Sequence, residues 1–289
     1  MLRAALLVLC ACSARPLSGA GAALWLGGDV HLGAGGREML GSLPELTHGE
    51  PVVVNLEGPV GDGAEASSSR RLANGRGVPA ALVRAGVRIA GVENNHANDL
   101  GESGRRETLA SLTAAGLAPA GVVHVVLGGQ RVMVVAVDLT PGVPEDLPAR
   151  LAHPADELLV ATFHVTGPAS YLAAPELEEA VEVALGAGAR VIAAHGTHAV
   201  ARVERRGSTI IAWGLGNLAF DCRCTDEGDG LLVRVELGHD GVTRATVVPV
   251  DSGLHGSPVR PAKNAPLALD LLESLASTPL RRSADRADF

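Results

Sequence analysis

Metal-binding and proton-carrying side chains recur in this sequence just after short apolar runs. The runs span residues 23–26, 52–54, 87–92, 158–163 and 190–194, and the side chains that follow them are Asp29 and His31, Glu57, Asn95 and His96, His164, and His195 and His198. Imidazole and carboxylate groups together bind borderline divalent cations such as Zn²⁺, Mn²⁺ or Fe²⁺. Two such cations roughly 4 Å apart, sharing one carboxylate, activate a water molecule and bind a phosphate-like or acyl oxygen. The set therefore predicts a two-metal site of the kind that hydrolases use.

The first two motifs also have plainer interpretations. Asp29 and His31 are two residues apart, so their side chains project the same way if the extended conformation continues through them. Glu57 precedes a Gly-Pro pair, where its carboxylate is able to bridge two cations. An aspartate after two glycines is also a common turn residue, and a glutamate at such a corner is able to cap a helix.

Residues 93–101 give the strongest signal for a functional site, because two amides, an imidazole and an acid fall in one predicted loop between a strand and a helix. The amide oxygen of Asn95 suits a hard cation, and a neighbouring His96 that binds no metal is able to protonate a leaving group. The plainer interpretation is an Asx-rich turn that caps the following helix. The other strand ends favour the functional interpretation.

The later histidines are weaker signals taken one at a time. A lone histidine such as His164 is more often a satisfied surface or core residue than a ligand. His195 and His198 place two imidazoles on one loop, which is more specific. In α/β sheets ligands bind beyond the carboxyl ends of strands, so strand ends that are distant in sequence converge on one site.

The elements that must position these residues follow from composition and periodicity. The chain is 47% hydrophobic with only 2% aromatic residues, so small aliphatic side chains fill its core and a layered α/β architecture is expected. Predicted strands span residues 23–26, 52–54, 87–92, 132–137, 158–163, 190–194, 209–213, 231–236 and 243–250, and predicted helices span 104–115, 175–185 and 265–276. Glycines at 128–129, 207 and 241 mark tight turns. Residues 61–77 are polar and predict a surface loop, and residues 23–289 predict a single domain.

Several classes of function are excluded. The net charge of −8 provides no basic surface for nucleic acid. The sequence has no Walker or dinucleotide-binding glycine motif and no Gly-x-Ser-x-Gly nucleophile motif.

Residues 1–22 predict an export signal, because Arg3 precedes an apolar run at 4–11 that is too short to span a bilayer. Two interpretations of its end remain open: secretion with cleavage after Ala22, or cleavage before Cys12 with a lipid anchor on that cysteine. Both predict an extracytoplasmic protein, and only the second gives it a membrane contact, through the lipid anchor on Cys12. Cys222 and Cys224 are one residue apart and are able to form a bridge or a reduced pair near a metal, and the sequence assigns them no role.

Several motifs, read in order, resemble the CapA family of poly-γ-glutamate capsule synthesis proteins within the calcineurin-like metallophosphoesterase superfamily. They are Gly28-Asp29-Val30-His31, Asn55-Leu56-Glu57-Gly58-Pro59, the stretch from Asn94-Asn95-His96 to Asp99-Leu100-Gly101, His164, His198 and Leu215-Gly216-Asn217. The resemblance covers residues 24–250. It implies a four-layer α-β-β-α sandwich of two mixed sheets, a dinuclear metal site, and work on or near a γ-linked glutamate polymer at the cell envelope.

The resemblance also implies residue roles. The metal ligands would be Asp29, His31, Glu57, Asn95, His164 and His198, with Glu57 bridging two ions. His96 would donate a proton and Asp99 would orient it, while Asn94 and Asn217 would contact substrate. This sequence departs from the family pattern at three places. His31 stands in place of the family's usual Met, and the sequence from His164 to Pro168 stands in place of His-Trp-Gly-x-Glu. The family's His-Pro-His becomes Gly196-Thr197-His198, so His195 is a candidate for the first imidazole.

Two functions are therefore compared. The first is a metal-dependent hydrolase of phosphoester or amide-type bonds, acting on an anionic polymer or a small substrate, and the joint presence of Asp29, Asn95 and His96 favours it. The second is a catalytically degenerate relative that binds or guides an anionic envelope polymer. The altered residues around His164 and His198 favour the second.

Overall fold

The computed structural model describes residues 22–64, 67–68, 70–222, 224–277 and 279–289. The described residues form two mixed β-sheets of eleven and six strands. The larger sheet contains β1 (Ala23–His31), β2 (Val52–Leu56), β3 (Val87–Gly91), β4 (Ala118–Ala120), β11 (Asn217–Phe220), β12 (Asp229–Gly238), β13 (Gly241–Asp251), β14 (Gly253–Leu254), β15 (Arg260–Pro261), β16 (Arg281–Arg282) and β17 (Ala287–Asp288). The smaller sheet contains β5 (Val122–Leu127), β6 (Gln130–Asp138), β7 (Leu158–His164), β8 (Val191–His195), β9 (Val203–Arg206) and β10 (Thr209–Ala212).

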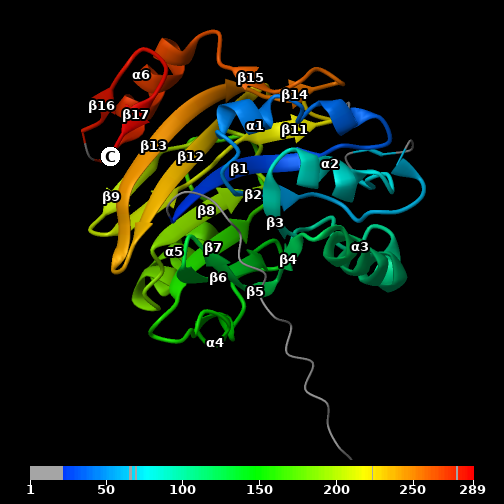
Figure 1. Ribbon diagram of the computed structural model, residues 1–289, viewed down its shortest axis with the longest axis horizontal. Helices are drawn as coiled ribbons and strands as arrows, with labels where there is room; N and C mark the ends of the chain where they lie inside the picture. Colours follow the sequence, from blue (N-terminus) through cyan, green and yellow to red (C-terminus); the bar gives the residue numbers. More distant parts are fainter. Residues whose placement is uncertain (1–21, 65–66, 69, 223, 278) are drawn as a thin grey trace, which may run out of the picture.

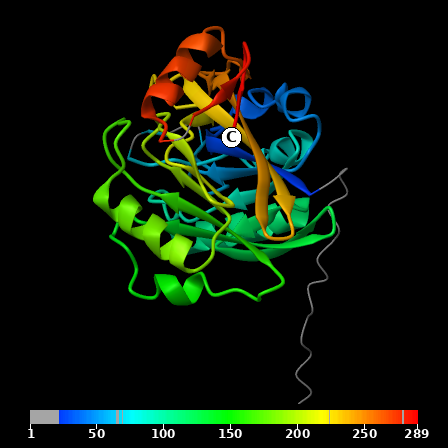
Figure 2. The ribbon, with the colours of Figure 1, turned by 90° about the vertical axis from the view of Figure 1, so that its left-hand side faces the viewer.

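Helices cover the outer face of each sheet. The described helices are η1 (Gly36–Glu38), α1 (Leu43–Leu46), α2 (Val78–Arg84), α3 (Gly101–Ala115), α4 (Leu147–Arg150), α5 (Pro175–Gly186) and α6 (Ala265–Leu275). Figure 1 shows α2 and α3 beside β2 and β3, and α4 and α5 beside β6 and β7. In the perpendicular view of Figure 2, α5 lies on the opposite side of the molecule from α1 and α2, with the strands between them.

Three apolar layers hold this arrangement together. Val53 faces the smaller sheet and packs in one cluster with Val160, whereas its neighbour Val54 packs in a second cluster with Leu82 of α2. A third cluster joins the smaller sheet to α4 and α5. Because successive side chains of a strand point to opposite faces, each continuous apolar run fills two layers at once. The predicted four-layer α-β-β-α sandwich of two mixed sheets is confirmed.

The glycine turns predicted from the sequence are also confirmed. Gly128 and Gly129 join β5 to β6, Gly207 joins β9 to β10, and Gly241 starts β13 after β12, and each pair of strands is antiparallel. All four glycines have positive φ, which L-residues with a Cβ adopt only at a cost in energy.

β1 is central to the larger sheet and changes partners along its length. Its first half pairs antiparallel with β12, whereas Asp29, Val30 and His31 pair parallel with β11. The change occurs at Gly28, where an added Cβ would lie 2.0 Å from the backbone oxygen of Gly216. The strand continues through Asp29 and His31, so these residues lie within β1 rather than after it.

The prediction of a surface loop at residues 61–77 is wrong for part of that segment. Leu72, Ala73 and Asn74 are buried. They return the chain to the sandwich after the exposed Arg70 and Arg71.

The predicted export signal and the Cys12 anchor lie outside the described residues, apart from Ala22. Among the described residues no helix is long and apolar enough to cross a membrane.

Glu50 joins the loop before β2 to β12. Its carboxylate accepts hydrogen bonds from Arg234 Nε at 2.7 Å, Arg234 Nη2 at 2.8 Å and Trp25 Nε1 at 2.8 Å. The hydrogen bonds from Arg234 are the largest influence on the pKa of Glu50, and they hold it below its ordinary value of 4.5. The ionised carboxylate therefore stabilises the fold above that value, and the contribution is lost as the pH falls through the folded pKa.

We expect Glu50→Gln to lower the free energy of unfolding by roughly 1–2 kcal/mol at pH 7. The difference from the wild type should shrink below pH 4.5. Urea unfolding at several pH values measures it, with the exposed Glu145→Gln as the control. A deficit that stays constant down to pH 3 would show that charge is not its cause.

Candidate metal centre

The carboxyl ends of strands from both sheets meet at one place. Asp29 lies in β1, Glu57 directly follows β2, and His164 and His195 end β7 and β8. Asp29 pairs in register with Asn55 of β2, and His164 pairs with His195. These four functional side chains, Asp29, Glu57, His164 and His195, are all buried.

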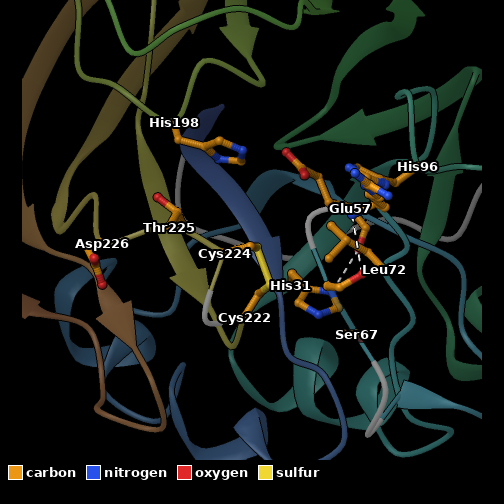
Figure 3. The surroundings of a disulfide bond; sticks show 12 residues. His31, Glu57, Ser67, Leu72, His96, His198, Cys222, Cys224, Thr225 and Asp226 are labelled. Atoms are coloured by element: carbon orange, nitrogen blue, oxygen red, sulfur yellow. Dashed lines mark hydrogen bonds between the residues drawn. A yellow bond between two sulfur atoms is a disulfide. The ribbon is translucent and has the colours of Figure 1, made fainter.

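Asp29, Glu57 and His198 form a triad that is able to hold a metal ion. One potential ligand atom from each lies within 4.8 Å of the others. Figure 3 shows the His198 ring and the Glu57 carboxylate pointing toward one another. His198 is partly exposed, with 28% of its side chain accessible, whereas both carboxylates are buried, so the triad is open on the His198 side.

The backbone at His198 is held in an unusual conformation. Its φ is +58°, a region that costs a residue with a Cβ about 1 kcal/mol or more. The ring is held by Asn217, whose Oδ1 lies 2.9 Å from Nδ1, while Asn217 Nδ2 donates to the backbone oxygen of Glu227 at 3.0 Å. Because Asn217 is fixed at both ends of its amide, it determines which ring nitrogen of His198 carries the proton.

A second set of amides fixes the two carboxylates. Asn55 Nδ2 donates to Asp29 Oδ1 at 2.8 Å and lies 3.4 Å from Glu57 Oε1, and the Gly196 backbone N–H donates to Asp29 Oδ2 at 2.9 Å. Asn94 is buried and donates to Asn55 Oδ1 at 3.1 Å and to the Leu56 backbone oxygen at 2.9 Å. The amides of Asn94 and Asn217 thus bind protein atoms, and contact of either residue with substrate stays a prediction.

The buried carboxylates and histidines of this site interact electrostatically. Burial is the largest influence on the pKa of Asp29 and raises it, but His195, 3.3 Å away, and the nearby His198 and His164 hold that pKa below its usual range. Burial likewise would lower the pKa of His164, yet contacts with Asp138 and Glu57 raise it to about 10. Carboxylates that attract a proton so strongly also attract a cation, which would displace that proton on binding.

The hydrogen-bonding state of three buried histidine ring nitrogens indicates whether the residues of this site fit a metal ion. Among the described residues His31 Nε2 has no hydrogen-bond partner, whereas His195 Nδ1 and His164 Nδ1 form no well-aligned hydrogen bond but lie 3.3 Å from Asp29 Oδ1 and 3.7 Å from Asp138 Oδ1. A buried polar atom without a partner costs about 1–3 kcal/mol, so it is expected to have a function. Buried carboxylates beside imidazoles form a donor set that suits Zn²⁺, Mn²⁺ or Fe²⁺. The residues at this site therefore fit a divalent metal ion.

His31 lies apart from the triad. Its Nδ1 is 3.3 Å from the backbone oxygen of Glu57, and its ring packs against Phe220 with centroids 5.4 Å apart. Figure 3 shows it on the disulfide side of Glu57, away from His198. Its predicted role as a ligand stays a prediction.

His96 and Asp99 form a dyad near the edge of the site. His96 Nδ1 lies 2.7 Å from Asp99 Oδ2, which also accepts the backbone N–H of Leu72 at 2.7 Å. Both side chains are partly accessible, and the neighbouring Asn95 is exposed. The dyad therefore places an oriented imidazole where solvent or a substrate can reach it, and coordination by Asn95 stays a prediction.

The model of one protein family matches residues 24–142 and 145–222, well over half of the chain. It describes the bacterial capsule synthesis protein PGA_cap. This chain belongs to the PGA_cap family. The predicted relationship to CapA is confirmed, since CapA proteins are capsule synthesis proteins of this kind.

Two further similarities support the family and the fold. The PGA biosynthesis protein CapA of Bacillus subtilis (strain 168) is 35% identical over 77 residues, which are 27% of this chain and 20% of that protein. The match thus spans about a fifth of the relative's length. A hypothetical protein from Thermus thermophilus, known from its crystal structure, superposes with a TM-score of 0.55 at 14% identity, over 80% of this chain and 99% of that one. At that identity the likeness concerns the fold.

The structure places His195 beside Asp29 of the candidate metal centre. The resemblance to CapA implies the first histidine of His-Pro-His at position 196, where this chain has Gly196, whose φ of +93° turns the chain directly after β8. His195, one residue earlier, ends β8 with its Nδ1 3.3 Å from Asp29 Oδ1. His195 and His198 thus both contact Asp29, although they are three residues apart.

Sequence reasoning missed two residues that support this site. Asn74 is fully buried, donates to the backbone oxygens of Glu57 and Gly58, and accepts the N–H of Leu32. The apolar pair directly before it, within an otherwise polar segment, was the available signal. Asp138 ends β6 with its Oδ1 3.7 Å from His164 Nδ1. It too follows an apolar run, which is the pattern that identified the other candidates.

Proposed function

We propose that this PGA_cap protein is a metal-dependent hydrolase of phosphoester or amide-type bonds. The observation that carries the proposal is the Asp29–Glu57–His198 triad, whose two carboxylates are buried and whose ligand atoms lie within 4.8 Å of one another, together with the oriented His96–Asp99 dyad. A purely structural core has no need for charged residues gathered in this way, because burying them costs free energy. The donor set thus supports a hydrolytic centre.

The proposed centre holds two divalent ions, Mn, Fe or Zn. Asp29 and His198 would bind one ion, Glu57 would be shared between both, and His164, His31 and Asn95 would complete the set, with His195 as a further candidate. When bound, such ions lower the pKa of a water molecule and neutralise charge on a phosphoryl or acyl oxygen. Asn55, which donates to Asp29 and approaches Glu57, keeps the two carboxylates in place.

His96 is proposed to protonate the leaving group. Asp99 binds its Nδ1 and orients the ring, which leaves Nε2 to face a substrate. Because Leu72 N–H also donates to Asp99 Oδ2, the acid has little freedom to turn away. The dyad therefore presents a proton at a fixed place.

The family supports the proposed substrate class. Its members are capsule synthesis proteins, and the Bacillus subtilis relative is named for PGA biosynthesis. We propose an anionic capsule polymer, or a small phosphoester or amide derived from its synthesis, as the substrate. The proposed location is extracytoplasmic, secreted or periplasmic, with Cys12 as the candidate lipid anchor.

Substitution by alanine distinguishes the proposed roles of Asn95 and His96. We expect Asn95→Ala to lower metal content, because it removes a proposed ligand. His96→Ala should retain the metal but lower turnover roughly 100-fold or more, because it removes the proton donor. Elemental mass spectrometry of protein prepared with Mn²⁺, Fe²⁺ and Zn²⁺ measures the first effect, and hydrolysis of chromogenic phosphoesters and γ-glutamyl amides measures the second.

The control is His239→Ala, since that ring is 96% accessible and remote from the triad. Wild-type metal content and turnover in both Asn95→Ala and His96→Ala would contradict the assigned roles. A wild-type protein that binds no metal would favour the second function, binding or guidance of an anionic polymer. This alternative is supported by Gly196, which stands where the resemblance to CapA implies a histidine.

A further inference from the structure

Cys222 and Cys224 form a disulfide directly after β11. Figure 3 shows it with His31, Glu57, His96 and His198 in its surroundings. The two sulfurs have different environments: Cys222 is buried in a cluster with Leu72 and Phe220, whereas Cys224 is exposed. An incoming thiolate therefore reaches Cys224 more easily than Cys222.

The strand before the disulfide supports the candidate metal centre. Phe220 packs against the His198 ring with centroids 4.9 Å apart and against His31 at 5.4 Å. Asn217, at the start of the same strand, holds His198 Nδ1. A change in the position of β11 would thus alter the packing of His198 and His31.

The loop after the disulfide also supports His198, through Asn217. The Glu227 backbone oxygen accepts Asn217 Nδ2 at 3.0 Å, and the Glu227 N–H donates to Thr225 Oγ1 at 3.1 Å. The bridge therefore lies within the segment that leads from β11 to Glu227, and the backbone oxygen of Glu227 binds the side-chain amide of Asn217 at the start of β11. His198 needs such support because its own φ is positive.

We propose that the Cys222–Cys224 disulfide is a reversible thiol–disulfide exchange site whose substrate is a dithiol reductant, and that its reduction loosens His198 through Asn217. The effect on metal affinity rests on the proposed function, whereas the exchange reaction and the loosening do not. A bridge with one exposed sulfur beside the site allows a reductant in the surrounding compartment to control the metal centre.

Reduction of the bridge takes two thiol–disulfide exchange steps. A thiolate of the dithiol attacks the sulfur of Cys224, which breaks the Cys222–Cys224 bond and forms a mixed disulfide. Cys222 leaves as a thiolate and takes up a proton. The second thiolate of the reductant attacks its own sulfur in the mixed disulfide, which releases Cys224 as a thiolate that is protonated in turn. The protein disulfide gains two electrons and two protons, and the dithiol becomes a disulfide.

The test follows the bridge and His198 separately. The full chain is treated with graded dithiothreitol and alkylated, and mass spectrometry of the peptide containing residues 222–224 gives the reduced fraction. Hydrogen exchange of peptides covering residues 195–200 and 217–220 is measured on the same samples. We expect the bridge to open while the chain stays folded, and exchange in 195–200 to rise about tenfold and return on reoxidation.

The double variant Cys222→Ser/Cys224→Ser removes the bridge without a reductant that would itself bind metal. It should show the faster exchange permanently, ignore dithiothreitol, and bind Zn²⁺ or Mn²⁺ roughly tenfold more weakly than the oxidised chain. A bridge that opens only on global unfolding, or faster exchange confined to residues 222–229, would overturn the inference. Absence of metal binding in both forms would instead contradict the proposed function, and the exchange rates would still decide the role of the disulfide.

Discussion

Asp29→Asn is expected to abolish metal binding and hydrolysis. The carboxylate of Asp29 is buried, lies within the triad, and is held by Asn55 and by the backbone N–H of Gly196. An asparagine removes the charge and presents an NH₂ group where one of those two donors now points. The neighbouring His195 would also lose the charge that favours its approach. Because even supporting residues around a metal change its affinity about 10–100-fold, the loss of this proposed ligand should lower metal affinity by more than roughly 100-fold.

Competition titration with a chromophoric chelator measures that affinity, and circular dichroism shows whether the variant remains folded. The matched control is Asp240→Asn, which removes the same charge from a side chain that is 93% accessible in the β12–β13 turn. Equal metal affinity in the two folded variants would contradict the placement of Asp29 in the metal centre.

Gly196→Ala is expected to disrupt the site through the backbone. An added Cβ would lie 2.6 Å from His164 Nε2 and 2.6 Å from the backbone oxygen of Val165, and the φ of Gly196 is +93°. Neither the Val165 backbone nor the buried His164 ring is free to retreat, since β7 pairs with β8 at this point. We expect a loss of roughly 3 kcal/mol in the free energy of unfolding, together with weaker metal binding.

Gly207→Ala distinguishes the cost of the positive φ from the cost of the steric overlap that an added Cβ at Gly196 would cause. Gly207 also has a positive φ, +61°, but an added Cβ there would meet nothing within 4 Å. It should therefore lose only about 1 kcal/mol, the cost of the backbone conformation, and retain wild-type metal affinity. Chemical denaturation compares the two variants. An equal loss at both positions would show that the space beside His164 does not limit residue 196.

Local patterns were sufficient to predict the elements that fill the core. The run at 52–54 is β2 (Val52–Leu56), the run at 158–163 is β7 (Leu158–His164), and the helix at 175–185 is α5 (Pro175–Gly186), with its proline in the first turn. Each depends on apolar periodicity and on residues that start or end an element, both of which are local. The edge strand β5 was missed because it is partly exposed and carries a histidine in its middle.

The sequence by itself determined a layered α/β fold, the strand ends at which the candidate site residues gather, and the three-residue spacing that joins His96 to Asp99, while the four-layer sandwich was implied by the resemblance to CapA. Only the tertiary structure decided which of those residues meet. Asp29 and His198 are far apart in sequence and are brought together by the packing of two sheets, whereas His31, two residues from Asp29, faces a backbone oxygen instead. Asn74 reaches Glu57 through a return of the chain that no periodicity marks. Side-chain contacts of this kind depend on strand register and sheet packing, which a linear pattern of residue types does not specify.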